Sequence, residues 1–318
     1  MKYRRLGRTN LEVSEIGYGT WGIGGNMWLD GNDLENTASL QRAFDLGVNF
    51  VDTALAYGNG HSEKIIGRVL KGRKERIYVA TKIPPINGKW PAKKGTKFHD
   101  AFTHNHIVSC TEASLRNLGA DYIDVQQFHV WNDEWANETE WQDAVSKLKS
   151  DGKIRFVGIS MNSHESGNGI EAAKSGLIDT FQVFYNIFDQ SAEDRLFGFC
   201  RDENIGVIAR VPFDEGSLTG KLTMDTTFPE GDFRSYYFTP ERKKEVLKRV
   251  DEIAKLLDGE AHSLPELALR YVLHDDAVST VIPGMRRVKH VESNCSVSDG
   301  KKLSDEIIAK LKRYHFYT

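Results

Sequence analysis

The sequence predicts an α/β protein that folds as a (β/α)8 barrel, the TIM-barrel architecture, with an N-terminal β-hairpin and long loops at the C-terminal rim. Two observations carry this prediction. Short apolar segments alternate with longer helical patterns along the chain, and the long polar segments all follow predicted strands. Because barrels of this length commonly form one unit, residues 1–318 are expected to be a single domain.

Eight segments rich in Val, Ile and aromatic residues have the length of strands buried on both faces of a parallel sheet. They are residues 15–20, 49–53, 77–82, 122–129, 154–160, 180–186, 206–211 and 279–284. The patterns between them, several of which end at a glycine, predict helices. These helices cover residues 35–46, 62–70, 106–118, 141–150, 169–174, 192–203 and 265–274.

A doubly wound open sheet is the alternative fold for such an alternation. Its G-x-G-x-x-G fingerprint is absent after the first strand, because the glycines of Gly19-Thr20-Trp21-Gly22-Ile23-Gly24-Gly25 have another spacing. Residues 2–6 and 11–15 flank Gly7-Arg8-Thr9-Asn10, which predicts a β-hairpin ahead of the barrel.

Three long segments are expected to be non-helical loops at the C-terminal rim. They follow the third, fourth and seventh strands and comprise residues 84–103, 130–138 and 212–238. Barrel enzymes build their active sites from such loops.

Composition excludes several classes of protein. With 40% hydrophobic and 27% charged residues the chain can bury a core, and a net charge of -3 argues against a nucleic-acid partner. No apolar run approaches the about 18 residues of a membrane span, and the first residues lack the apolar region of a secretory signal. Cys110, Cys200 and Cys295 are widely spaced, which indicates neither a disulfide framework nor a metal site. We expect a cytoplasmic protein with no membrane partner.

Four polar residues fall at or just beyond the ends of consecutive predicted strands. Asp52 and Tyr57 follow the second strand, Lys82 ends the third and His129 ends the fourth. Each alone has a structural explanation, but strand ends converge at the rim of a barrel. An ammonium lowers the pKa of a nearby tyrosine, a carboxylate keeps the ammonium charged, and an imidazole donates a hydrogen bond to a substrate oxygen. Together they predict a proton-transfer site.

These residues belong to a longer, ordered set of motifs. It begins with Asp52-Thr53-Ala54, Tyr57-Gly58, Glu63, Gly67, Ala80-Thr81-Lys82, Asp121-Tyr122-Ile123-Asp124 and Gln127-Phe128-His129. It continues with Gly152-Lys153-Ile154-Arg155, Gly158-Ile159-Ser160, Gln182, Tyr185-Asn186, Leu218-Thr219-Gly220-Lys221 and Ile282-Pro283-Gly284. In order and spacing, over nearly the whole chain, these motifs resemble those of the aldo-keto reductases.

The resemblance implies a barrel that binds NADPH or NADP+ without a Rossmann domain and reduces an aldehyde or ketone to the alcohol by hydride transfer. Tyr57 would be the general acid and Lys82 the modulator of its pKa. Asp52 would pair with the lysine, and His129 would polarise and orient the carbonyl. Aromatic and hydrogen-bonding residues are mixed in the rim loops, which suits a sugar or other polyol-type substrate and, almost as well, an aromatic ketone.

The same resemblance implies contacts to the nicotinamide end of the cofactor. Near the ring these are Gly19, Thr20, Trp21 and Asp52, and at its carboxamide Ser160, Asn162 and Gln182. Asn162 stands one place beyond the usual asparagine. Arg210 occupies a position where many relatives have an aromatic residue against the ring, and a planar guanidinium can also stack there. The alternative for Arg210 is a contact with Asp214 or Glu215.

The phosphates and adenosine are expected beyond the seventh and eighth strands. Glycines there let the backbone approach the pyrophosphate, and Arg286 would face the 2′-phosphate. The predicted contacts are Pro212, Phe213, Gly216, Leu218, Gly220, Lys221, Gly284, Arg286, His290 and Asn294. A solvated basic helix start is the alternative explanation of the charges.

Two other functions are compatible with the sequence. One is an aldolase that forms a Schiff base on Lys82, with Tyr57 as proton shuttle. The other is a cofactor-binding protein that senses redox state and turns over carbonyls slowly. A metal hydrolase is disfavoured because His129 has no second histidine at ligand spacing. The sequence does not indicate an oligomeric state.

Overall fold

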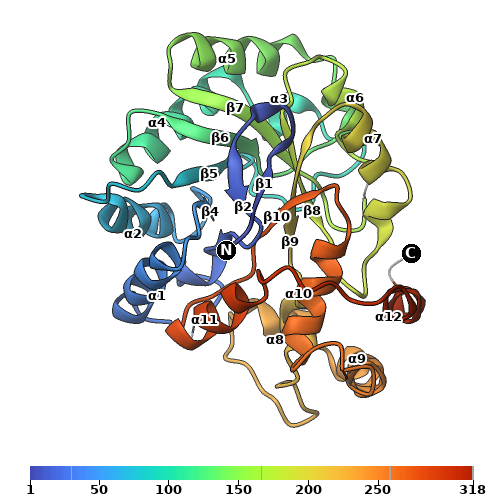
Figure 1. Ribbon diagram of the computed structural model, residues 1–318. Helices are drawn as coiled ribbons and strands as arrows, with labels where there is room; N and C mark the ends of the chain where they lie inside the picture. Colours follow the sequence, from blue (N-terminus) through green and yellow to red (C-terminus); the bar gives the residue numbers. More distant parts are fainter. Residues whose placement is uncertain (30, 166, 258, 317–318) are drawn as a thin grey trace.

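The computed structural model describes residues 1–29, 31–165, 167–257 and 259–316. Within them, eight parallel strands pair in the order β10-β9-β8-β7-β6-β5-β4-β3, and helices surround them (Figure 1). The bridges Ile16↔Val281 and Gly19↔Gly284 join the two ends of this order, so the sheet curves back on itself. The predicted α/β barrel is confirmed.

The barrel strands are short and almost completely buried, because helices cover their outer face and side chains fill the interior. They are β3 (Tyr18–Gly19), β4 (Phe50–Asp52), β5 (Tyr78–Ile83), β6 (Ile123–Phe128), β7 (Ile154–Ser160), β8 (Thr180–Phe184), β9 (Gly206–Arg210) and β10 (Val278–Val281). Each predicted strand overlaps one of them. Most differences lie at the ends, where residues predicted as strand belong to the flanking loops.

Helices follow most strands and pack around the barrel. They are α1 (Asp33–Asp45), α2 (His61–Leu70), α3 (Phe98–Ala101), α4 (His104–Leu118), α5 (Thr139–Ser150), α6 (Ile170–Ala173), α7 (Leu196–Asp202), α8 (Phe233–Tyr237), α9 (Pro240–Ala254), α10 (Leu264–His274), α11 (Val288–Ser296) and α12 (Asp305–Leu311). The predicted helices overlap α1, α2, α4, α5, α6, α7 and α10.

The expectation that the three rim segments are wholly non-helical is wrong. Residues 84–103 contain α3, residues 212–238 contain α8, and residues 130–138 contain the 3-10 turn Asp133–Trp135. These elements are too short to show a helical period in the sequence. The side chain of Asp232 instead fixes the start of α8, since it accepts a hydrogen bond from the Arg234 backbone N–H at 3.0 Å.

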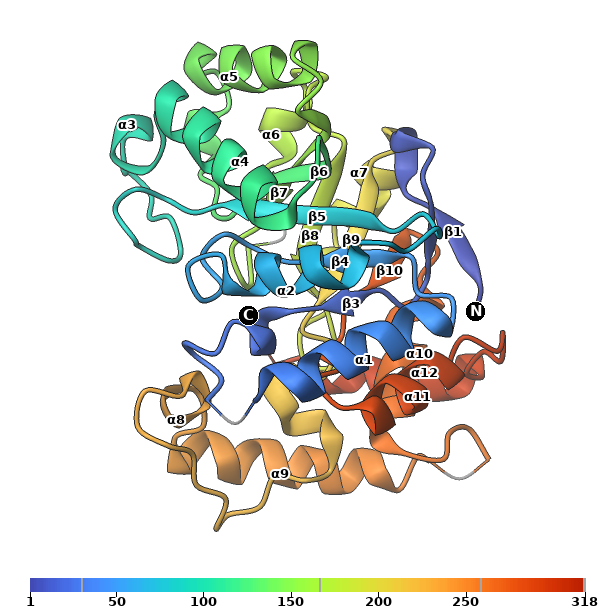
Figure 2. The same cartoon turned by 90° about the vertical axis from the view of Figure 1, so that its left-hand side faces the viewer.

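The predicted hairpin closes the N-terminal end of the barrel. Strands β1 (Tyr3–Arg5) and β2 (Glu12–Ser14) are antiparallel. Gly7, at the tip, has φ +49, and a Cβ there would lie 2.2 Å from the Gly206 nitrogen, so only glycine fits. The hairpin joins interior barrel residues in one apolar cluster of Leu6, Leu11, Val13, Phe50, Ala80, Val125, Ile208 and Ile282. Figure 2 shows the hairpin at one end of the strands and α3 and α8 at the other, open end.

The three cysteines are free and buried. Burial raises the pKa of the Cys110 and Cys295 thiols to about 11 and that of Cys200 to about 12. Because the thiolate is the reactive form, these side chains are unreactive at neutral pH.

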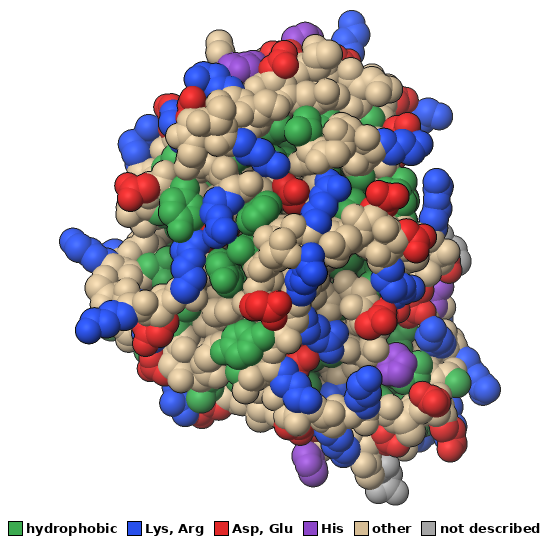
Figure 3. Space-filling view, turned by 45° about the horizontal axis from the view of Figure 1, so that its top comes forward, with side chains coloured by type: hydrophobic (Ala, Val, Ile, Leu, Met, Phe, Trp, Pro, Cys, Tyr) green, Lys and Arg blue, Asp and Glu red, His purple; other side chains and the backbone are tan. Residues whose placement is uncertain are grey.

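The surface carries charges of both signs. The chain has 42 Lys and Arg against 45 Asp and Glu, and Figure 3 shows both kinds interspersed over one face. Among the helices in the described part of the chain, none is long and apolar enough to cross a membrane.

Candidate active site

Lys82 lies at the centre of the candidate site, near the C-terminal end of β5. Its Nζ donates to Asp52 Oδ2 at 2.5 Å, to the Thr53 carbonyl at 2.8 Å and to the Tyr57 hydroxyl at 3.4 Å. Burial acts to lower the pKa of Lys82, but Asp52 and Tyr57 outweigh burial and raise it above its ordinary value. Lys82 is therefore an ammonium at neutral pH, with its three donors directed at three oxygens.

Tyr57 lies in the turn that follows β4, where its N–H donates to the Ala54 carbonyl at 3.0 Å. Burial raises the pKa of the phenol, and the Lys82 ammonium works against this without cancelling it. The expected effect of the lysine is present, but burial outweighs it, so the net shift of the Tyr57 pKa is upward. Tyr57 thus holds its proton at neutral pH, as a general acid must.

His129 directly follows β6, and its N–H donates to the Ile83 carbonyl at 3.0 Å. The imidazole meets the Tyr57 ring edge to face, with centroids 5.8 Å apart, and the Trp90 ring at 5.6 Å. Burial, followed by the charges of Lys82 and Arg210, holds the pKa of His129 well below its usual value. The ring is therefore neutral, and its Nδ1 is buried with no hydrogen-bond partner among the described residues.

Asp52, like Lys82, has several hydrogen-bond partners in the site. It is buried, with 2% of its surface exposed. While Oδ2 accepts from Lys82, Oδ1 accepts from Gln182 Nε2 at 2.7 Å and from Gln127 Nε2 at 3.0 Å. Gln127 belongs to the motif that ends at His129, but no role for it was predicted from the sequence. The signal was its position two residues before His129, because alternate residues of a strand share a face.

Arg210 ends β9 beside the group formed by Tyr57 and His129. Its Nη2 donates to the Met161 carbonyl at 3.0 Å, and its Cζ lies 5.2 Å from the centroid of the Phe184 ring. Nε is buried without an acceptor among the described residues. Asp214, one of its two alternative partners, instead bonds Ser217, Tyr237 and Arg242.

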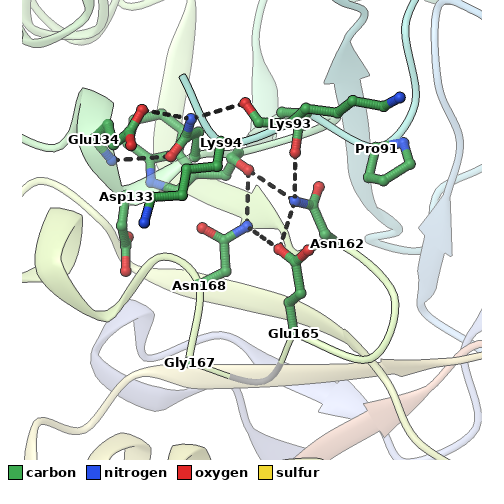
Figure 4. Close-up of a pocket in the computed structure, with 12 residues that line it drawn as sticks. Pro91, Lys93, Lys94, Asp133, Glu134, Asn162, Glu165, Gly167 and Asn168 are labelled. Atoms are coloured by element: carbon green, nitrogen blue, oxygen red, sulfur yellow. Dashed lines mark hydrogen bonds between the residues drawn. The ribbon is translucent and has the colours of Figure 1, made fainter. Parts of the chain in front are cut away.

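Asn162 lines a pocket of about 640 Å³ at the rim (Figure 4). Its Nδ2 donates to the Ala92 carbonyl at 3.2 Å, to the Trp131 carbonyl at 3.0 Å and to Glu165 Oε2 at 2.8 Å. These bonds join the loops that follow β5, β6 and β7. Only Oδ1, which is buried and unpartnered within the described ranges, is left for the predicted carboxamide contact.

Basic residues predicted to bind phosphate gather after β9 and β10. Lys221 Nζ lies 3.4 Å from His290 Nε2, on α11. Burial and then the charges of Lys221, Lys289, Arg287 and Arg286 lower the pKa of His290 to about 4. Cations gathered around a neutral imidazole make a region that favours an anion.

Arg286 turns toward the loop that follows β3. Its Cζ lies 5.6 Å from the Trp28 ring centroid, and a Cβ added at Gly22 or Gly31 would meet its side chain at 2.8 Å. This loop also touches the loop after β9, because the Phe233 N–H donates to the Met27 carbonyl at 2.9 Å. The two loops therefore lie together beside the basic residues.

The other predicted cofactor contacts lie at or near the same rim. Trp21 packs 5.0 Å from Phe233, Thr20 Oγ1 donates to the Asp52 carbonyl at 2.9 Å, and the Gly19 N–H donates to the Pro283 carbonyl at 3.1 Å. Ser160, Leu218 and Asn294 are buried, whereas Gly220 and Gly284 are exposed. Gly216 has φ +114 in the loop after β9, so glycine is needed there for the backbone.

Known proteins resemble this chain in sequence and in fold. The sequence model of the aldo/keto reductase family matches residues 15–315. The chain belongs to the aldo-keto reductase family. It is an oxidoreductase of the TIM-barrel fold, in a family that uses nicotinamide cofactors.

Individual relatives of this aldo-keto reductase are named for different activities. It is 33% identical to an aldo-keto reductase of Bacillus subtilis (strain 168) over 298 residues, which cover 92% of this chain and 87% of that protein. It is 30% identical to an NADH-specific methylglyoxal reductase of Escherichia coli (strain K12) over 309 residues, 92% of each. Its fold matches the glycerol dehydrogenase of Gluconobacter oxydans with a TM-score of 0.80 and 32% identity, covering 98% and 94% of the two chains.

Proposed function

We propose that this aldo-keto reductase reduces an aldehyde or ketone to the alcohol with NADPH, and that Tyr57 is the general acid. The observation that supports this most directly is the set of hydrogen bonds from Lys82 to Asp52, Thr53 and Tyr57. A protonated phenol beside a fixed ammonium can give up its proton and keep the resulting phenolate stabilised.

Each residue of the site has its own role in the proposed reaction. When bound, the cofactor supplies a hydride to the carbonyl carbon. Tyr57 delivers its proton to the carbonyl oxygen, while a neutral His129 donates a hydrogen bond to that oxygen and orients it. Lys82 holds the phenolate, and Asp52 keeps Lys82 charged and in place. Burial strengthens each of these interactions by excluding water.

The chain has groups suited to each part of a nicotinamide cofactor. Asn162 Oδ1 is a buried acceptor without a partner among the described residues, and it would accept from the carboxamide N–H. Asn162 lies two residues beyond Ser160, which pairs with Gln182 across β7 and β8. Arg210 would stack on the ring. Lys221, Arg286 and His290 would bind phosphate, and the positive charges of Lys221 and Arg286 favour a cofactor with a 2′-phosphate. We therefore infer that the cofactor is NADPH, although one relative is NADH-specific.

The substrate class that we infer is a small hydroxylated carbonyl of the sugar or polyol type. Trp90 is 49% exposed and lies against His129, so an aromatic face borders the place where the carbonyl binds. The neighbouring pocket adds side-chain amides and carboxylates from Asn132, Asn168 and Glu165. Aromatic faces combined with hydrogen-bonding groups suit a polyol.

The Schiff-base aldolase has less support. Its mechanism needs an uncharged Lys82, whereas Asp52 and Tyr57 raise the pKa of this amine and so favour the ammonium. A redox-sensing protein would use the same cofactor contacts but would reduce carbonyls slowly. The rate of carbonyl reduction therefore distinguishes it from a reductase.

The test is a set of initial rates of NADPH and NADH oxidation with sugar aldehydes, keto sugars, aromatic ketones and a steroid ketone. We expect turnover of the hydroxylated carbonyls with NADPH and little with the steroid. Tight NADPH binding without turnover of any carbonyl would favour the sensor. Efficient reduction of the steroid while the sugars stay inert would overturn the substrate class.

A further inference from the structure

Arg210 brings a second cation to the mouth of the barrel. Its charge acts on the pKa of both Tyr57 and His129, so the guanidinium lies close to the groups that would handle a carbonyl. Burial lowers the pKa of Arg210 itself, which reflects the free-energy cost of enclosing this charge. Of its donors, only Nη2 has acceptors among the described residues, a backbone carbonyl and the hydroxyl of Ser163.

The carboxylates nearest to Arg210 are engaged elsewhere. Asp52 is paired with Lys82 at 2.5 Å, and Asp189 with His164 at 2.6 Å. Glu215 completes the set, and burial together with Asp214 raises its pKa to about 8. The charge of Arg210 works against this rise, so Glu215 and Arg210 lie near enough to influence each other. None of the ion pairs formed among the described residues includes Arg210.

Arg210 therefore has no direct ionic partner among the described residues of the mouth. Lys82 and Asp52 form their own ion pair, His129 and Tyr57 are uncharged, and the carboxyl groups of Glu215 and Asp189 act on Arg210 without pairing with it. We propose that Arg210 determines substrate specificity by binding a negatively charged group, a carboxylate or a phosphate, on the carbonyl substrate. This inference rests on the proposed function and narrows its substrate class to hydroxylated carbonyls that carry an anionic group.

The geometry of a guanidinium suits this task. Its planar donors match the oxygens of a carboxylate or phosphate, which a lysine ammonium does only as a point charge. Nη1 also has no acceptor among the described residues and, unlike Nε, is not enclosed, so a substrate oxygen would satisfy a donor that the fold leaves unpaired. Stacking on the nicotinamide uses the face of the same group, while the anion uses its edge.

The experiment compares kcat/KM within two matched pairs of substrates. Glyceraldehyde 3-phosphate against glyceraldehyde tests phosphate, and glucuronate against glucose tests carboxylate. Each pair is measured with wild type, Arg210→Met, Arg210→Lys and the control Arg201→Met. Arg201 is half-exposed on α7, which leads into the opposite end of β9. Using the ratio within a pair cancels any effect of a variant on cofactor binding or on hydride transfer.

We expect wild type and Arg201→Met to prefer the anionic member of at least one pair by about tenfold or more, the size of one charge-assisted hydrogen bond. Arg210→Met should bring the ratio close to one, and Arg210→Lys should restore part of it. The pair that shows the preference identifies the anion.

Two results would overturn the inference while leaving the proposed function intact. One is wild-type turnover without a preference for charge in either pair, and the other is an equal loss for both members in Arg210→Met, which would mean that Arg210 supports only the loop or the nicotinamide. Absence of turnover with these four aldehydes and with the ketones of the earlier panel would instead contradict the proposed function itself. If Arg210→Met does not fold, the salt dependence of the wild-type ratio decides, because added salt should lower it.

Discussion

Tyr57 is subject to two opposing influences on its pKa, and their balance decides what it can do at neutral pH. Burial raises the pKa, while the ammonium of Lys82 at 3.4 Å lowers it. The stronger effect is burial, so the phenol is protonated over the physiological range. Carbonyl reduction should accordingly hold steady at neutral pH and fall only when the pH rises through the raised pKa of Tyr57.

Replacing Tyr57 by Phe tests this role directly. The ring keeps its packing against His129 but loses the proton donor, so kcat should fall by about 10²- to 10⁴-fold. NADPH affinity, measured by fluorescence titration, should change little. Activity within a few-fold of wild type would remove Tyr57 from the role of general acid. Tyr3→Phe, which alters an exposed tyrosine on the hairpin, is the control.

Lys82→Met should be comparably damaging to carbonyl reduction. Without the ammonium, burial is opposed only by the weaker effect of Arg210 and the pKa of Tyr57 rises further, so raising the pH does not restore the rate. Rate against pH for the variant and for the exposed-lysine control Lys64→Met gives the comparison. Borohydride trapping of a substrate adduct on Lys82 in wild type would instead support the aldolase.

At the scale of elements, the sequence was most informative at the strand ends. Register places Asp52 opposite Ala80 and Lys82 opposite Gln127, so residues at consecutive strand ends become neighbours as soon as the strands pair. Four side chains could therefore be grouped before any contact was known. The barrel order itself followed from the alternation of strands and helices.

The contacts that depend on the conformation of the loops could not be predicted from the sequence. The amide donors of Asn162 serve three loops, and Arg286 packs against the loop after β3; neither direction follows from local pattern. Helix α9 was missed for a different reason. Only Val246, Val250 and Ile253 of its fifteen residues are buried, so its apolar face is narrow, although Thr239 and Pro240 mark its start.

The predicted preference for NADPH over NADH depends on residues in the loop after β9 and just before helix α11. Arg286→Ala should weaken NADPH binding by about 10- to 100-fold, the size of one or two charge-assisted hydrogen bonds to the 2′-phosphate, and leave NADH almost unchanged. Titrations of both cofactors against wild type, Arg286→Ala and Lys221→Ala give the measurement. If wild type binds the two cofactors equally, or Arg286→Ala weakens both alike, these residues do not select the 2′-phosphate.

At the scale of the whole molecule, stability and catalysis are assigned to opposite ends of the barrel. The hairpin fills the N-terminal end, whereas the rim contains groups whose burial is unfavourable, among them Glu215. The single domain expected for residues 1–318 stays a prediction. Residues 30, 166, 258, 317 and 318 lie outside the described part of the chain.

Glu215 should make the stability of the fold depend on pH. Its pKa is raised from 4.5 to about 8 in the folded state, mainly by burial. The stabilisation is then complete below pH 4.5 and is lost as the pH rises through about 8. Glu215→Gln should therefore gain about 1 kcal/mol or more over wild type between pH 5 and pH 9. Urea unfolding at both values measures this, with exposed Glu230→Gln as control. An equal difference at the two pH values would contradict it.

The buried cysteines have a practical consequence for observing the rim loops. Since all three thiols are enclosed and have pKa values of about 11 to 12, the native chain offers no readily labelled sulfur. A single cysteine placed at Met224, which is 51% exposed in the loop after β9, would be the preferred target of a maleimide dye. The fluorescence of that dye would report on how this loop responds to each cofactor without altering the rest of the molecule.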